Sequence, residues 1–136
     1  MKVKILLVDD DCAHRLVASR AVKKLPHPVE IIESGSADTA INLINEAFKN
    51  AAPDDQPFNL AIIDLKLDHK SGIDVLNELR SFSSEMVLPV IIVSTSDLAD
   101  HINSSYAARA NCYIIKGADP LSYSKNLYQA VSYFSR

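Results

Sequence analysis

The stretch LAIIDL, residues 60–65, is a short apolar run that contains a single carboxylate, Asp64. Its length and its β-branched isoleucines are typical of a strand buried on both faces of a parallel sheet. Asp64 stands at the carboxyl end of the expected strand, the edge of an open α/β sheet where ligands bind and reactive groups gather. The stretch therefore makes Asp64 the candidate reactive group of the chain.

Five short apolar runs recur along the chain, with segments long enough for helices between them. The runs are Val3–Val8, Val29–Ile32, Leu60–Ile63, Val90–Val93 and Tyr113–Ile115. Strands that alternate with helical segments indicate βαβ units and a parallel sheet. Because such crossovers are right-handed, few strand orders are available, and the flavodoxin-like order 2-1-3-4-5 suits five strands. We expect one doubly wound α/β domain over residues 1–136, with five helices and no output domain.

Helix-start signals follow each expected strand. The expected first residues or caps are Asp11, Ser36, Gly72, Ser96 or Asp97, and Asp119-Pro120. The first helix should run over about residues 11–25 and the fourth should end near residue 108, from capping residues and apolar spacing. Leu16 falls away from the sheet-facing stripe of the first helix, beside the active edge. We expect Leu16 to contribute to partner docking, and the neighbouring His14, beside the acidic cluster, to contact the partner or the site itself.

Composition narrows the class of protein. The chain of 136 residues has 14 Lys and Arg against 17 Asp and Glu, and this balance without a basic stripe argues against nucleic acid as a direct partner. No apolar run approaches the roughly 18 residues of a membrane span, and no signal peptide is evident, so we expect a cytoplasmic protein. Cys12 and Cys112 should lie at opposite ends of the sheet, too far apart for a disulfide.

Polar groups follow four of the five expected strands. They are Asp9, Asp10 and Asp11 after the first, Asp64 after the third, Ser94 and Thr95 after the fourth, and Lys116 after the fifth. In the order 2-1-3-4-5 these strands adjoin, so their ends meet at one edge of the sheet. One aspartate after a strand is usually a helix cap. The convergence of carboxylates, a hydroxyl and an ammonium indicates a functional site.

Clustered carboxylates repel one another, at about 4 kcal/mol for a pair 4 Å apart when the effective dielectric constant is near 20. Either their pKa values rise or a cation binds. The candidate ligands are all oxygens, which favours Mg²⁺. A magnesium ion, a lysine and a hydroxyl around a nucleophilic carboxylate are suited to phosphoryl transfer, with Asp64 becoming an aspartyl phosphate.

Four motifs in this order resemble the receiver domain of two-component response regulators. They are ILLVDDD at residues 5–11, IDL at 63–65 with Gly72 beyond, VST at 93–95 and YIIK at 113–116. The resemblance implies Asp64 as phosphoacceptor, with Ser94 and Lys116 binding the phosphoryl oxygens and Tyr113 as the switch residue. It also implies a Mg²⁺ site of Asp10, Asp64 and the backbone carbonyl of Lys66, with Asp9 acting behind these ligands or through water.

The resemblance implies a phosphohistidine on a sensor kinase as the phosphoryl donor. The segment from Ser105 to Ile114 is similar to small stand-alone regulators paired with phytochromes, which suggests a phytochrome-like kinase and dimerisation through helix four, strand five and helix five. Such a protein would signal to a downstream protein and catalyse only its own phosphorylation and dephosphorylation. Three residues depart from the family pattern: Gly117 and Asp68 replace common prolines, and Arg109 replaces a helix-ending glycine.

Two alternative functions remain open from the residues alone. The first is a pseudo-receiver that binds partners without phosphate, which Gly117 after Lys116 keeps open. The second is a phosphatase of the haloacid dehalogenase type, with Asp9 as nucleophile and Asp11 as acid/base. Against the phosphatase, the chain lacks the acidic pair expected after a later strand and has no cap insertion.

Overall fold

The computed structural model describes residues 2–117 and 119–135 as a five-stranded parallel sheet in the order β2-β1-β3-β4-β5. The strands are β1 (Val3–Val8), β2 (Val29–Ser34), β3 (Leu60–Asp64), β4 (Val90–Ser94) and β5 (Cys112–Ile115). This order confirms the predicted flavodoxin-like topology. The ends of the predicted domain, Met1 and Arg136, lie outside the described residues.

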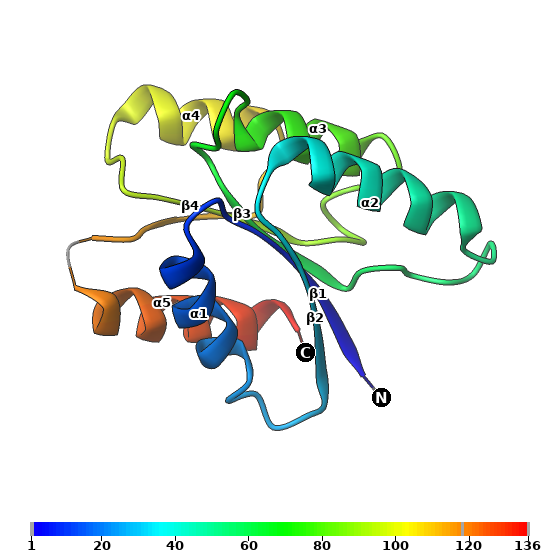
Figure 1. The fold of residues 1–136 in the computed structure, drawn as a ribbon, viewed down its shortest axis with the longest axis horizontal. Coiled ribbons are helices and arrows are strands. Elements are labelled where there is room, and N and C mark those ends of the chain that lie inside the picture. Colours follow the sequence, from blue (N-terminus) through cyan, green and yellow to red (C-terminus); the bar gives the residue numbers. More distant parts are fainter. Residues whose placement is uncertain (1, 118, 136) are drawn as a thin grey trace.

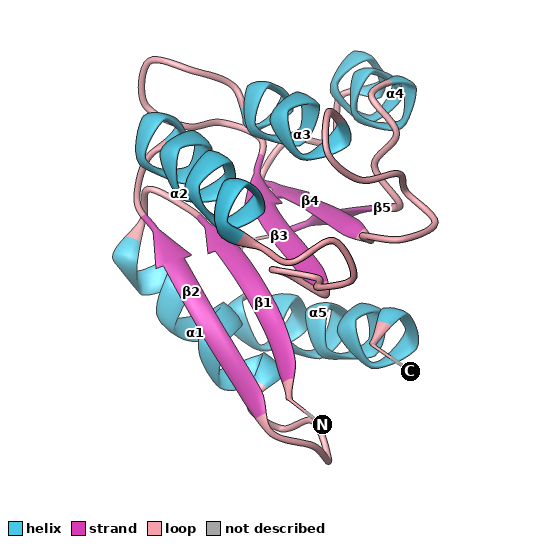
Figure 2. Cartoon of the chain, turned by 90° about the vertical axis from the view of Figure 1, so that its right-hand side faces the viewer, coloured by secondary structure: helices cyan, strands magenta, loops and turns pink. Residues whose placement is uncertain are grey.

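Five helices cover the sheet in two layers. They are α1 (Cys12–Val22), α2 (Ala37–Asn50), α3 (Gly72–Arg80), α4 (Ala99–Ala107) and α5 (Pro120–Phe134). Helices α2, α3 and α4 lie on one face of the sheet, and α1 and α5 lie on the other (Figures 1 and 2). In the described part of the chain, no helix is long and apolar enough to cross a membrane.

Strand β3 occupies the centre of the sheet, and all five of its residues are buried. Its side chains alternate between two cores: Ala61 and Ile63 pack under α2 and α3, while Leu60 and Ile62 pack against α1 and α5. Burial on both faces explains why this strand reads as an unbroken apolar run. Asp64 is the last residue of this strand and so lies at the carboxyl edge of the sheet.

The structure corrects several helix boundaries. Helix α4 begins at Ala99 after Leu98, which makes no side-chain cap, so neither Ser96 nor Asp97 caps it; Ser96 Oγ instead accepts a hydrogen bond from Leu98 N at 3.2 Å. Helix α1 ends at Val22 rather than near residue 25. The expected caps at Asp11, Ser36 and Asp119 are confirmed, since each side chain accepts a hydrogen bond from a backbone N–H of the first helical turn. The expected helix start at Gly72 is also confirmed, and Ser71 caps it.

Candidate functional site

The carboxyl ends of β1, β3 and β5 bring three buried charged side chains together. Lys116 Nζ lies 2.8 Å from Asp9 Oδ2 and 3.1 Å from Asp64 Oδ2. Asp9 is 1% exposed and Lys116 is 4% exposed, so this ammonium bridges two carboxylates largely out of contact with water. Buried charges persist in proteins when they are paired and hydrogen-bonded in this way. The edge predicted from the sequence is therefore a pre-organised ion cluster.

Asp9 is held by the backbone and by helix α1. Its Oδ1 accepts a hydrogen bond from Asp11 N at 2.9 Å, and its carbonyl oxygen accepts one from Arg15 Nη1 at 2.6 Å. Both carboxylate oxygens of Asp9 are thus engaged, one by the amide of Asp11 and the other by Lys116. These contacts fix the carboxylate of Asp9 in position.

Asp10 is half-buried and lies at the rim of the cluster. One oxygen from each of Asp9, Asp10 and Asp64 lies within 4.8 Å of the others, a spacing that could hold a metal ion. Burial raises the pKa of Asp10, and the nearby carboxylates of Asp68 and Asp9 raise it further. The donors are all oxygens, as a hard divalent cation requires. The residues present therefore fit a magnesium ion.

The surroundings of the Asp64 carboxylate raise its pKa. Burial, followed by repulsion from Asp9, raises the pKa of Asp64 to about 6, although Lys116 acts in the opposite direction. A cation beside Asp64 would relieve both causes by supplying opposite charge. The perturbed pKa, a positioned ammonium and the neighbouring carboxylates make this residue the functional candidate of the cluster.

Ser94 and Tyr113 are joined through the loop between β4 and α4. Ser94 Oγ is buried and accepts a hydrogen bond from Ser96 N at 3.1 Å. Tyr113 Oη donates to the carbonyl oxygen of Ser96 at 2.9 Å. Ser96 Oγ also lies 2.6 Å from His101 Nδ1 on α4. Ser96 therefore connects the hydroxyl at the end of β4 with β5 and α4, a role the sequence analysis missed.

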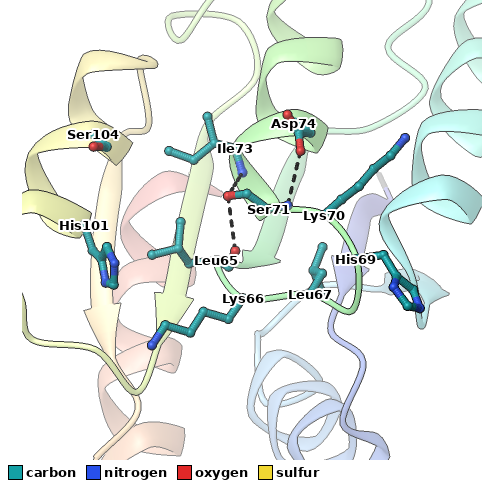
Figure 3. A pocket seen from close by; sticks show the side chains of 10 residues that line it. All are labelled: Leu65, Lys66, Leu67, His69, Lys70, Ser71, Ile73, Asp74, His101 and Ser104. Carbon is teal, nitrogen blue, oxygen red and sulfur yellow. Dashed lines mark hydrogen bonds between the residues drawn. The ribbon is translucent and has the colours of Figure 1, made fainter.

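The loop from β3 to α3 folds tightly back on the strand. Leu65 O accepts a hydrogen bond from Gly72 N at 2.7 Å. It also accepts one from Ser71 Oγ at 3.3 Å (Figure 3). Lys66 N lies 3.3 Å from Asp64 Oδ1, which places the Lys66 backbone beside the cluster. Its side chain is exposed and lines a cavity of about 680 Å³ with His101 and other residues of this loop and of α3 and α4.

The docking residues predicted on α1 have different surroundings. Leu16 is 51% exposed and belongs to the surface beside the cluster. His14 Nδ1 lies 2.9 Å from Lys116 Nζ, so this histidine contacts the ion cluster directly. Cys12 and Cys112 are both free thiols, as expected from their placement.

The residues that depart from the family pattern are also placed. Gly117 and Arg109 both adopt the left-handed region, with φ values of 68° and 71°. Asp68 lies close enough to Asp10 to raise its pKa, so the replacement of proline adds a carboxylate to the rim. The sequence offered a signal for this contact, because Asp68 follows Asp64 by four residues in a short loop.

The sequence matches the family described as response regulator receiver domain over residues 5–128. Response regulator Rcp1 of Synechocystis sp. is 31% identical over 114 residues, which span 82% of this chain and 75% of Rcp1. The probable methanogenesis regulatory protein FilR2 of Methanothrix harundinacea is 28% identical over 121 residues, covering 88% of this chain and 73% of FilR2.

Solved structures agree with this relationship. The phosphorylated cyanobacterial phytochrome response regulator RcpA is 27% identical and superposes with a TM-score of 0.85, covering 99% of this chain and 95% of RcpA. The Mn²⁺-bound form of Rcp1 is 25% identical, with a TM-score of 0.80 and coverage of 97% and 94%. The chain belongs to the response regulator receiver family of two-component signalling.

Proposed function

We propose that this protein is a phospho-acceptor switch in which Asp64 takes a phosphoryl group from a phosphohistidine. The observation that carries the proposal is the buried Lys116 ammonium, 3.1 Å from Asp64 and 2.8 Å from Asp9. An oxygen of Asp64 attacks the phosphorus while the phosphorus–nitrogen bond breaks. The leaving imidazole keeps the bonding electron pair, and the product is an aspartyl phosphate.

The cation expected for this reaction is Mg²⁺. We propose that Asp10, Asp64 and the Lys66 carbonyl hold it, with Asp9 orienting the set from behind or through a water molecule. When bound, magnesium supplies positive charge to the oxygens of the transferring phosphoryl group. The all-oxygen cluster of Asp9, Asp10 and Asp64 supports this assignment.

Lys116 and Ser94 provide the remaining phosphoryl contacts in the proposal. The ammonium can exchange its contact with Asp64 for one with a phosphoryl oxygen, since both are anionic acceptors. Ser94 Oγ now accepts from Ser96 N and would rotate to donate its hydroxyl proton to the phosphoryl group. That movement would disturb the Ser96 loop, to which Tyr113 is hydrogen-bonded.

We infer that the output surface is formed by α4, β5 and α5. Exposed apolar side chains gather on these elements and the loop before α4: Leu98, Tyr106, Ile115 and Leu121. Tyr113 lies between this surface and Ser96, so a change at Ser94 can reach the surface through one loop. A downstream protein or a second copy of the chain would bind there.

The partner on the input side is a sensor histidine kinase in this proposal. The relatives Rcp1 and RcpA include a cyanobacterial phytochrome response regulator, which favours a phytochrome-like kinase. Leu16, exposed beside the cluster, would contact the kinase. Kinases make phosphohistidine from ATP, so we place the exchange in the cytoplasm.

The cluster geometry favours Asp64 over Asp9 as the nucleophile. The side chain of Asp9 is 1% exposed and that of Asp64 is 9% exposed, so Asp64 is the more accessible of the two carboxylates. A phosphatase acting through Asp9 would need that carboxylate exposed to its substrate. A phosphate-independent binding role, in turn, would not need the raised pKa of Asp64 or its paired ammonium.

The proposal is tested by intact-protein mass spectrometry after incubation with acetyl phosphate. Wild-type protein should gain one phosphoryl group in the presence of Mg²⁺ and none with EDTA. Asp64→Asn should gain none under either condition, while the control Asp97→Asn, in the loop before α4, should behave as wild type. Label that persists in Asp64→Asn would reject the assignment of the phosphoacceptor.

A further inference from the structure

A histidine on α1 reaches the ion cluster from a position that the family motifs do not include. His14 Nδ1 lies 2.9 Å from Lys116 Nζ, although the residues are 102 positions apart in the sequence. A lysine ammonium can only donate hydrogen bonds, so Nδ1 is the acceptor and the proton of the neutral ring is on Nε2. Nδ1 also lies 3.7 Å from Asp11 Oδ2, and a hydrogen bond there would need a proton on Nδ1. We assign the hydrogen bond to Lys116, because that contact is shorter by 0.8 Å.

The three donors of the Lys116 ammonium are all used. They meet Asp9 Oδ2 at 2.8 Å, His14 Nδ1 at 2.9 Å and Asp64 Oδ2 at 3.1 Å. Asp9 follows β1, His14 lies in the first turn of α1 and Asp64 ends β3, so the ammonium is held from three separate elements. A lysine head group otherwise moves freely on its four-carbon stem.

The backbone beyond Lys116 supplies little restraint of its own. Gly117 has a φ of +68°, and a Cβ added there would meet no atom within 4 Å. Neither side-chain packing nor a proline ring therefore restricts the chain at this position. The Lys116 backbone is held by the hydrogen bond from its N to Ser94 O at 2.7 Å. The ammonium at the end of the stem is held by its three contacts, of which His14 provides the one that is not a carboxylate.

We propose that His14 is a positioning residue for Lys116. It holds the ammonium between Asp9 and Asp64. When a phosphoryl oxygen accepts the Lys116 N–H that Asp64 now accepts, His14 still accepts its own hydrogen bond from Lys116. Its effect on phosphorylation rests on the proposed function, whereas the contact itself can be measured without phosphate. A neutral acceptor restrains the lysine without adding negative charge that would repel the phosphoryl group.

The first test measures phosphorylation rates with acetyl phosphate and Mg²⁺. His14→Ala should lower the maximal rate about tenfold, the effect of losing one hydrogen bond to a charged group. His14→Asn keeps a side-chain acceptor and should recover most of that loss, which a merely structural role would not predict. His27→Ala is the matched control at the opposite edge of the sheet, because within residues 2–117 and 119–135 its Nε2 has no hydrogen-bond partner.

The second test records ¹⁵N spectra of the histidine rings in metal-free protein. His14 should show the Nε2–H tautomer, and Lys116→Met should shift its Nδ1 resonance while leaving the His27 ring unchanged. Thermal unfolding of each variant shows whether it folds. If the His14 variants do not fold, the ring spectra of the wild type and Lys116→Met still test the contact between His14 and Lys116.

Three results would overturn the inference: wild-type rates in His14→Ala, equal loss in His14→Ala and His14→Asn, or a His14 ring indifferent to Lys116→Met. If the wild type takes no phosphate at all, the proposed function fails instead. The ring spectra then still show whether His14 positions Lys116.

Discussion

Gly72 packs directly against the backbone of Asp64, so closely that a Cβ at residue 72 would overlap the Asp64 carbonyl oxygen and lie 2.9 Å from its carbonyl carbon. The first residue of α3 therefore touches the last residue of β3. Gly72 N also donates to Leu65 O at 2.7 Å, which closes the loop between the two elements. The glycine is required by this close approach, since the atom in its way is backbone.

Gly72→Ala should destabilise the fold and displace Asp64. Because backbone cannot move aside as a flexible side chain can, we expect a loss of about 2 kcal/mol in the free energy of unfolding. The measurement is urea denaturation, with Gly35→Ala as a control, where an added Cβ meets only the end of the Arg15 side chain at 3.3 Å. Equal stability of the two variants would contradict the close packing.

Asp64→Asn should stabilise the metal-free protein at neutral pH. The pKa of Asp64 is raised from 3.8 to about 6, so the native state loses stability as the pH rises from about 4 to about 6, by at most about 3 kcal/mol. Below pH 4 the carboxyl is protonated in both folded and unfolded protein, and the difference should vanish. Urea denaturation in EDTA from pH 4 to 8 measures the difference in the free energy of unfolding between Asp64→Asn and the wild type. A difference that does not grow with pH would count against the raised pKa.

Arg80 joins the end of α3 to the turn before β5. Its guanidinium donates to Arg109 O at 3.0 and 2.8 Å, to Leu88 O at 2.8 Å and to Asn111 Oδ1 at 3.0 Å. Arg80→Met removes these donors from the carbonyl oxygens of Leu88 and Arg109, while Asn111 Oδ1 still accepts from Val90 N, and it should reduce the free energy of unfolding by about 2–4 kcal/mol. The exposed control Arg20→Met should change it little. Similar stabilities of both variants would show that these hydrogen bonds contribute nothing net.

Arg109 is expected to carry backbone strain. Its φ of 71° lies in the left-handed region, which glycine adopts without a steric penalty. Arg109→Gly should therefore raise the free energy of unfolding by about 1 kcal/mol, since the contact with Glu85 at 3.8 Å is exposed and worth little. Arg109→Ala removes the same side chain but keeps a Cβ, so it should show no gain. A higher free energy of unfolding in both variants would show that the Arg109 side chain, and not the backbone conformation, is destabilising.

The features that follow from short-range sequence patterns were predictable. The buried run before Asp64 and the helix caps at Asp11 and Ser36 follow from periodicity and local chemistry. The strand order follows from the alternation of strands and helices together with the right-handedness of their crossovers. The start of α4 could not be predicted in this way. Leu98 occupies the cap position, and Ser96 forms hydrogen bonds within the loop and with His101 instead.

The individual side-chain partners at the sheet edge could not be assigned from the sequence. The sheet edge that gathers Asp9, Asp64 and Lys116 could be deduced from strand order, but the His14 contact depends on where one side chain on α1 points. The same holds for Ser96, whose partners on β5 and α4 are set by the packing of three elements. Strand order predicts which backbone ends meet, while side-chain partners follow from tertiary packing.

The most direct test of the central claim is to locate the phosphoryl group chemically. Protein treated with acetyl phosphate and Mg²⁺ is reduced with borohydride, which converts an aspartyl phosphate to homoserine, and its peptides are sequenced by mass spectrometry. The account predicts homoserine at position 64, with none in the identically treated sample that received EDTA. Homoserine at position 9 or 10, or an unmodified residue 64 in protein that has taken up phosphate, would contradict it.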